Sequence, residues 1–225
     1  MVSNENFFGF WSKAISSPQE HPDDEAALKT NPHGFPLDTL VGPWMGPIRT
    51  APVIILTLNG NLVGNGEEAR AAQMPVARAF AAHNLTGDAP LPDWHAIGNP
   101  AGLGWTTGRL TQFELSYKDA ADKVAFVNLI AYKSKDGSKH MNMRMANKLP
   151  SSLMMQAWMR DTIFPEAEAG ERLVICLRSH RAWDLEPGTQ RGESLFAPKC
   201  TRGGHMAHGE MREKICLAVR RAVFD

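Results

Sequence analysis

Two asparagines stand where this sequence is best placed to do chemistry, because each follows a short apolar run. Asn59 comes directly after residues 52–58, and Asn128 lies near the end of residues 124–129. Runs of this length and β-branched content predict strands that are buried on both faces. Ligands of open α/β sheets bind just beyond the carboxyl ends of such strands. We therefore expect both amides at one edge of a sheet.

A side-chain amide has no useful pKa, and this limits what the two asparagines can do. Asn59 can hold a water molecule, a substrate or a stretch of backbone in place, but it cannot act as a general base. Asn128 offers a donor and an acceptor side by side, which matches the edge of a pyrimidine base. Structural alternatives stay open for both, because Asn59-Gly60 is a strong turn former and Asn128 can tie its strand end to a neighbouring loop.

The elements that must position these residues alternate between strands and helices. Further strands are predicted at residues 172–177 and 194–197, and helices at residues 67–84 with a break at Pro75, at 150–164 and at 209–224. This alternation predicts an α/β fold with a central, mainly parallel four-stranded sheet covered by helices on both faces. Residues 85–109, which include Trp94, Trp105 and Arg109, are predicted to form a long irregular loop.

The composition is that of an ordinary globular protein. A chain of 225 residues with 43% hydrophobic and 21% charged residues predicts one domain over residues 1–225, on which a helical and extended segment at 1–42 packs. No apolar run approaches the roughly 20 residues that a spanning helix needs, and residues 1–11 lack the features of a secretory signal. We therefore expect a cytoplasmic protein with no membrane partner.

Cysteine and histidine usage predicts neither disulfides nor a metal site. Cys176, Cys200 and Cys216 are odd in number and far apart, which argues against a disulfide framework. No His-x-x-x-His or His/Cys pair shows ligand spacing; His205 and His208, three residues apart after a Gly-Gly turn, come nearest. The glycines after Asn59 lack the ending of a phosphate-binding P-loop. No metal and no cofactor are expected.

The charge of the chain is zero overall but unevenly distributed. Residues 1–120 carry 7 basic and 12 acidic side chains, against 17 and 12 in residues 121–225. A basic half allows a phosphate-binding face, although solvated surface charge is the alternative. Candidates for phosphate contact follow the third and fourth predicted strands: Arg178, Ser179, Lys199, Thr201, Arg202 and His205.

The surroundings of the two asparagines resemble motifs of a known family. A Gly-containing lead-in at 43–46, an Ala before an apolar strand and a strand that ends in Leu-Asn are similar to the first motif of the uracil-DNA glycosylase superfamily. A second strand that ends in Asn128 continues the resemblance, which covers roughly residues 40–225. The loop reads Asn59-Gly60-Asn61 where the nearest branch has Asn-Pro-Gly, and the late His-Pro-Ser motif is replaced by residues 198–205.

The resemblance implies a three-layer α/β/α fold and a monofunctional DNA glycosylase. Such an enzyme hydrolyses the bond between a flipped base and deoxyribose and leaves an abasic site, with no cofactor and no covalent intermediate. It implies Asn59 as the catalytic residue, Asn128, Gly60 and Asn61 as base-binding residues, and DNA as the partner, with no obligatory protein partner. The aromatic residue that stacks on the base would be one of Trp94, Trp105 and Phe113.

The sequence leaves two questions open. The base is uracil or a modified pyrimidine, and the role is DNA repair or defence against phage with modified DNA. Two alternatives come from other classes of protein. One is a nucleic-acid-binding module of the same fold without catalysis, and the other is a hydrolase that acts on free nucleotides.

Overall fold

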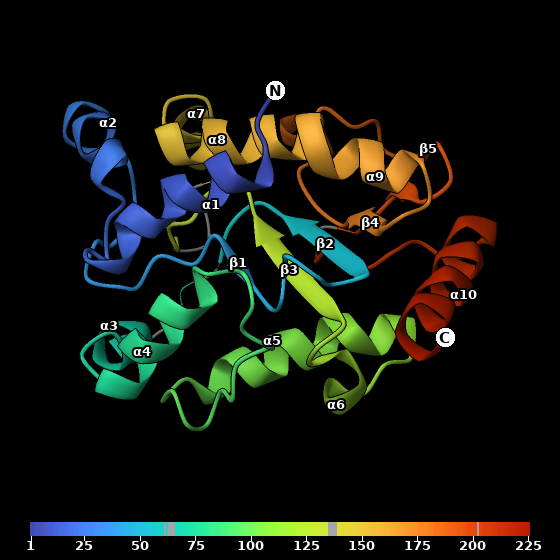
Figure 1. Ribbon diagram of the computed structural model, residues 1–225, viewed down its shortest axis with the longest axis horizontal. Helices are drawn as coiled ribbons and strands as arrows, with labels where there is room; N and C mark the ends of the chain where they lie inside the picture. Colours follow the sequence, from blue (N-terminus) through green and yellow to red (C-terminus); the bar gives the residue numbers. More distant parts are fainter. Residues whose placement is uncertain (61, 63–65, 135–138, 202) are drawn as a thin grey trace.

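A six-stranded mixed sheet forms the centre of the molecule (Figure 1). The computed structural model describes residues 1–225 except 61, 63–65, 135–138 and 202. The strand order is β1-β3-β2-β4-β6-β5; β3, β2, β4 and β6 pair in parallel, while β1 and β5 pair antiparallel at the two edges. The strands are β1 Trp44–Met45, β2 Val53–Thr57, β3 Val124–Asn128, β4 Leu173–Cys176, β5 Thr189–Arg191 and β6 Leu195–Ala197.

The predicted α/β class is confirmed, but the predicted number of four strands is wrong. The four predicted strands are found as β2, β3, β4 and β6. The two strands that were not predicted, β1 and β5, have 2 and 3 residues and are too short to show a periodic hydrophobic pattern.

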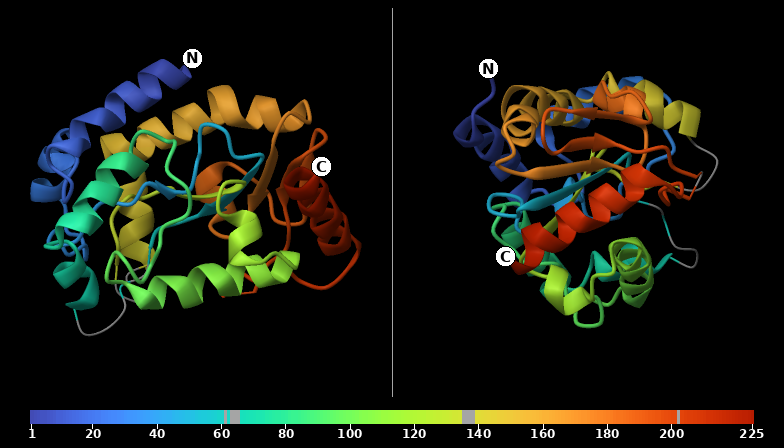
Figure 2. Two further views of the ribbon diagram at one scale, coloured as in Figure 1. Left: turned by 60° about the horizontal axis from the view of Figure 1, so that its bottom comes forward. Right: turned by 90° about the vertical axis from the view of Figure 1, so that its right-hand side faces the viewer.

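Helices cover both faces of the sheet (Figures 1 and 2). Ile54 and Leu56 of β2 belong to the apolar cluster under α1 and α8, whereas Val53 and Ile55 belong to the cluster under α5 and α10. Burial on both faces explains why the strand sequences are continuously apolar. The α-helices are α1 Asn4–Ser12, α2 Glu25–Thr30, α3 Glu67–Ala71, α4 Pro75–Asn84, α5 Pro100–Leu110, α6 Tyr117–Ala120, α7 Lys139–Ala146, α8 Pro150–Trp158, α9 Phe164–Glu168 and α10 Glu210–Phe224.

Two helical regions show how proline and glycine affect prediction. The predicted break at Pro75 is confirmed, because Pro75 opens α4 at a position where its missing N–H leaves no hydrogen bond unmade. The prediction of an irregular loop over residues 85–109 is wrong at its end, where α5 begins at Pro100. Three glycines inside α5 lower its helix propensity. The sequence pattern therefore did not predict this helix. No helix among the described residues is long and apolar enough to cross a membrane.

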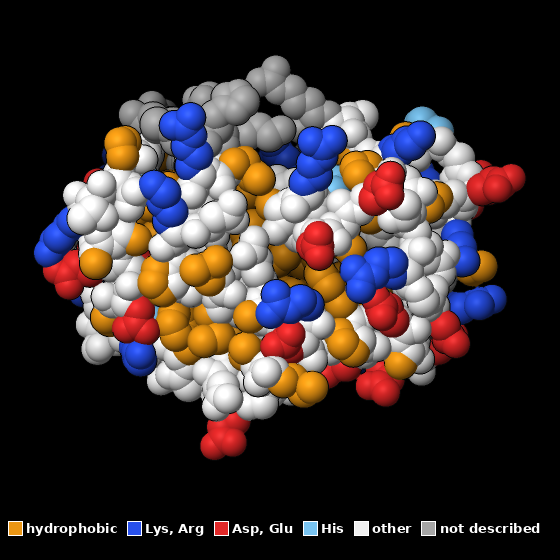
Figure 3. Space-filling view, turned by 90° about the horizontal axis from the view of Figure 1, so that it is seen from above, with side chains coloured by type: hydrophobic (Ala, Val, Ile, Leu, Met, Phe, Trp, Pro, Cys, Tyr) orange, Lys and Arg blue, Asp and Glu red, His pale blue; other side chains and the backbone are white. Residues whose placement is uncertain are grey.

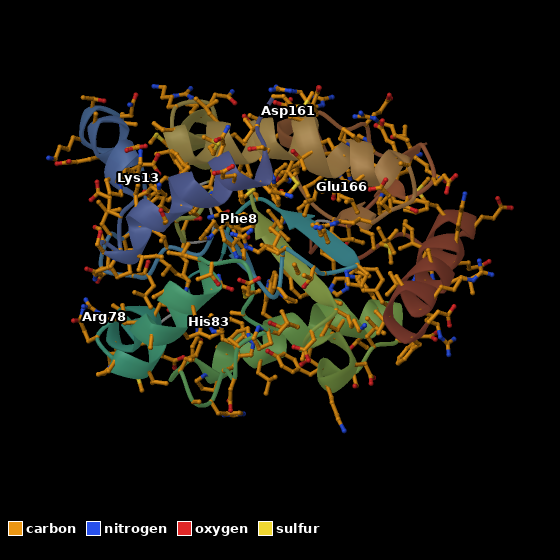
Figure 4. The ribbon with its side chains drawn as sticks, in the orientation of Figure 1. Phe8, Lys13, Arg78, His83, Asp161 and Glu166 are labelled. Atoms are coloured by element: carbon orange, nitrogen blue, oxygen red, sulfur yellow. The ribbon has the colours of Figure 1, made fainter. Side chains whose placement is uncertain are left out.

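The N-terminal segment is held against the sheet by aromatic stacking and a buried carboxylate. Phe7 of α1 stacks on Trp158 with ring centroids 3.9 Å apart, and Phe8 points from α1 toward the sheet (Figure 4). Asp24 is fully buried; one carboxylate oxygen accepts from the Tyr132 hydroxyl at 2.8 Å and the other from the Ser151 N–H at 2.9 Å. Residues just before α2 are thereby fixed to the loop after β3.

Candidate functional site

The chain topology opens a crevice at the carboxyl ends of β2 and β3. The connection from β2 to β3 includes α5 and α6, which pack on one face, and the connection from β3 to β4 includes α8 and α9, which pack on the other. Adjacent parallel strands whose connections leave toward opposite faces are the usual place for a ligand site in such a sheet. Both predicted asparagines lie at this end of the sheet.

A pocket of about 190 Å³ lies beside this crevice. Its polar lining includes Asn128, Asn99, Lys133 and Glu68, and most of the remaining surface is apolar. Aromatic side chains from the segment between β2 and β3 complete the wall: Phe80, Trp94 and Trp105. A small, largely apolar cavity with a few convergent polar groups is the usual form of a small-molecule or base-binding site.

Asn59 does not line this pocket, but it joins two loops that each contribute a lining residue, Gly60 and Lys133. Its side-chain N–H groups donate to Ser134 Oγ at 2.6 Å and to the Tyr132 carbonyl at 3.3 Å. Backbone bonds reinforce the link, because Ser134 N–H donates to the Gly60 carbonyl at 3.1 Å. Gly60 lines the pocket. The Asn59 Oδ1 atom receives no hydrogen bond from the residues that the structure describes.

Asn128 is both a tether and a pocket residue. Its Oδ1 accepts from the Thr57 hydroxyl at 2.6 Å, and its amide N–H donates to the Gly42 carbonyl at 2.7 Å. The structural alternative for Asn128 is therefore realised. An amide oxygen has a second lone pair and an amide nitrogen a second N–H, so the side chain can still present both to a ligand.

Lys133 and Glu68 are pocket residues that the sequence did not single out. Burial lowers the pKa of the Lys133 ammonium, and the Glu68 carboxylate opposes this shift. Glu68 is only 3% exposed. Lys133 lies in the loop after β3 and Glu68 in the first turn of α3, so the two share no motif spacing. Only the packing of that loop against the segment after β2 brings them together.

Two of the three candidate stacking residues reach the pocket. Trp94 and Trp105 line it, whereas Phe113 is fully buried in the core between the sheet and α10. A side chain at Gly102 would collide with the Trp94 ring, so glycine there lets the indole lie close against α5. Trp105 packs edge-on against Phe126 of β3.

Two arginines and a histidine gather beyond the ends of β4 and β6 in a group that we call the arginine cluster: Arg109, Arg178 and His205. Arg109 Nη1 lies 3.3 Å from His205 Nε2, and its guanidinium lies over the Trp105 ring at 5.4 Å. Burial, and then the neighbouring charge of Arg178, lower the pKa of Arg109. Within the described part of the chain, neither arginine forms an ion pair with a carboxylate.

The other predicted phosphate-contact residues lie around this cluster. Lys199 is exposed and rests its side chain against Gly188, and Thr201 Oγ1 accepts from the His205 N–H at 3.3 Å. Ser179 adopts a left-handed conformation with φ of 59°. Arg202 and Asn61, predicted to bind DNA and base respectively, lie outside the described residues. Arg109 lies in the segment 85–109 that the sequence predicts to be a loop, and it was not predicted to be a site residue.

Comparisons of the chain with models of protein families, with curated proteins and with solved structures found no match. Function has therefore to be inferred from the pocket and its surroundings. Among the described residues, no group of three or more His, Cys, Asp and Glu side chains is arranged to hold a metal ion. The three cysteines are free.

Proposed function

We propose that this protein is a DNA glycosylase that excises a flipped uracil-like or modified pyrimidine base and leaves an abasic site. The observation that carries the proposal is the connection between the pocket and the arginine cluster along α5. Trp105 lines the pocket, and Arg109, four residues later on the same helix face, belongs to the cluster. A base in the pocket would place its flanking phosphates near cations.

The pocket suits a planar heterocycle. A flipped base loses its stacking and pairing at a cost of a few kcal/mol, which contacts in the pocket must offset. Trp94 and Trp105 offer aromatic surfaces, each worth about 1–3 kcal/mol per stacked base. Asn128 supplies a donor and an acceptor at one edge. Helices on both faces of the sheet also support a three-layer α/β/α arrangement of the uracil-DNA glycosylase type.

Side-chain amides and oriented dipoles are sufficient to lower the barrier to base excision. Breaking the bond between base and deoxyribose develops positive charge on the sugar and negative charge on the leaving base, so oriented groups and a positioned water molecule lower the barrier. In this proposal Asn59 Oδ1 holds the water, and Asn128 donates to the departing base. No metal or cofactor takes part.

The surface charge favours the arginine cluster as the DNA-binding region. On the face that carries α8 and α9, basic and acidic side chains are interspersed (Figure 3). Interspersed charges give a phosphate backbone little net attraction, whereas adjacent cations without carboxylate partners attract it.

The test is an abasic-site assay on oligonucleotides that each contain one candidate base, as single strands and as duplexes. We expect alkali-labile cleavage at uracil or at a pyrimidine with a modified ring, and much less with Asn59→Ala. Binding without cleavage would identify a non-catalytic nucleic-acid-binding module. Neither binding nor cleavage, together with turnover of free nucleotides, would identify a small-molecule hydrolase.

A further inference from the structure

Lys133 is a half-buried lysine at the proposed base pocket. It lines the pocket with Asn128 and Gly60. In the part of the chain that the structure describes, its side chain forms no hydrogen bond and no ion pair within 4.0 Å. The charge of the Glu68 carboxylate acts on it and raises its pKa.

The loop that carries Lys133 is fixed on both sides of this residue. Asn59 donates to the carbonyl of Tyr132 and to the hydroxyl of Ser134, the two chain neighbours of Lys133. The Lys133 side chain lies along Gly60, where an added Cβ would come within 3.2 Å of its Cγ. The backbone and the start of the Lys133 side chain are therefore positioned.

We propose that Lys133 is a nucleophile that attacks C1′ of an abasic deoxyribose, which gives the protein a second activity, cleavage of the DNA strand at the abasic site. This inference rests on the proposed function, because the abasic site is the product of base excision. It changes the expectation of a monofunctional glycosylase without a covalent intermediate.

The proposed step balances without a co-reactant. The neutral Lys133 amine adds to the C1′ aldehyde of the open-chain sugar, and water leaves to form an imine. The imine makes the C2′ proton acidic; that proton passes to water, and the bond from C3′ to its phosphate breaks. Hydrolysis of the imine then releases an unsaturated aldehyde on one fragment, a phosphate on the other, and the free amine.

The pocket favours the form of lysine that this step requires. A lysine becomes a nucleophile when its surroundings disfavour the ammonium, as an apolar pocket does. Burial lowers the pKa of Lys133, and the Glu68 carboxylate acts in the opposite direction. The Glu68 charge thus reduces the fraction of the amine that burial leaves neutral at a given pH.

The experiment uses the full chain and an oligonucleotide with a preformed abasic site, so that base excision is not needed. Sodium borohydride reduces an imine to a stable amine and links the protein to DNA. We expect a linked product with the unaltered protein, mapped to Lys133 by mass spectrometry of its peptides. Lys133→Met should lose at least nine-tenths of this product, whereas Lys118→Met, at an exposed site away from the pocket, should keep it.

A second variant tests the chemistry rather than the fold. Glu68→Gln removes the charge that raises the pKa of Lys133, so more amine is neutral at each pH. The pH profile of linking should therefore move toward lower pH. Equal thermal midpoints and DNA affinities of the two Lys133 and Lys118 variants would show that both are folded.

Three results would overturn the proposal: no linked product with the unaltered protein, a product mapped to another amine, or a Glu68→Gln profile that stays in place or moves to higher pH. Base excision without borohydride linking would leave the proposed function standing and remove this inference. Linking to preformed abasic sites without excision of any base would support this inference and remove the proposed function.

Discussion

At the residue scale, Asn59 has two roles, one for its side-chain nitrogen and one for its side-chain oxygen. The nitrogen joins the loops that contain Gly60 and Lys133, and the oxygen accepts no hydrogen bond from the described residues. Asn59→Ala should lower single-turnover base excision by about 10²–10³, the loss typical of a positioning group in a transition state. Retention of more than about a tenth of the unaltered rate would remove Asn59 from the catalytic machinery.

Thr57 provides the control for Asn128. Asn128→Asp exchanges a donor for an acceptor and so should change the order in which substrate bases are excised. Thr57→Val removes the hydroxyl that tethers Asn128 Oδ1 but leaves its amide in place, and should lower all rates without reordering them. Rates measured over one panel of bases separate the two. An unchanged order with Asn128→Asp would leave Asn128 only its tethering role.

At the scale of elements, the segment before α2 supports the site through Tyr132. The Tyr132 hydroxyl donates to the buried Asp24 and accepts from the His21 N–H at 3.1 Å. Tyr132→Phe removes both bonds and leaves a buried carboxylate oxygen unpaired. Its free energy of unfolding should fall by about 1–3 kcal/mol in urea denaturation, and borohydride linking through the neighbouring Lys133 should fall with it.

Asn4→Ala is the matched control for that substitution. Asn4 Oδ1 accepts from the Trp158 indole N–H at 2.9 Å and so also holds the N-terminal segment, without touching the Tyr132 loop. It should lower stability while linking is preserved in the folded protein. If both variants lose linking in proportion to stability, Tyr132 has no specific effect on the position of Lys133.

The same scale explains what the sequence can and cannot predict. Asn59 and Asn128 are placed at one sheet edge by the apolar runs before them, so sequence alone predicts their neighbourhood. Arg109 was missed because glycines conceal α5. Lys133 and Glu68 were missed because their proximity depends on how two loops pair, and no local pattern encodes that contact. Edge strands β1 and β5 were missed because they are too short for a pattern.

For the whole molecule, we expect DNA to bind at the edge where the parallel strands end. Arg109→Ala combined with Arg178→Ala should weaken binding similarly for all sequences and reduce the salt slope by about two, roughly one for each phosphate contact. Lys148→Ala combined with Arg160→Ala, on the side of α7 to α9, is the control for charge alone. Equal salt slopes for both pairs would place the DNA elsewhere, and Lys199 with Arg202 would be the next pair to test.

The position of Trp105 and Arg109 on one helix has a consequence for what the protein accepts. Four residues of α-helix advance about 6 Å, so α5 fixes the separation between the Trp105 ring and the Arg109 guanidinium. Inserting one residue between them would turn Arg109 by about 100° around the helix and away from its partners. Under the proposed function, a substrate must offer a ring and a phosphate at one set separation. Any nucleotide within a DNA strand has both groups, whereas a free base has the ring but no phosphate.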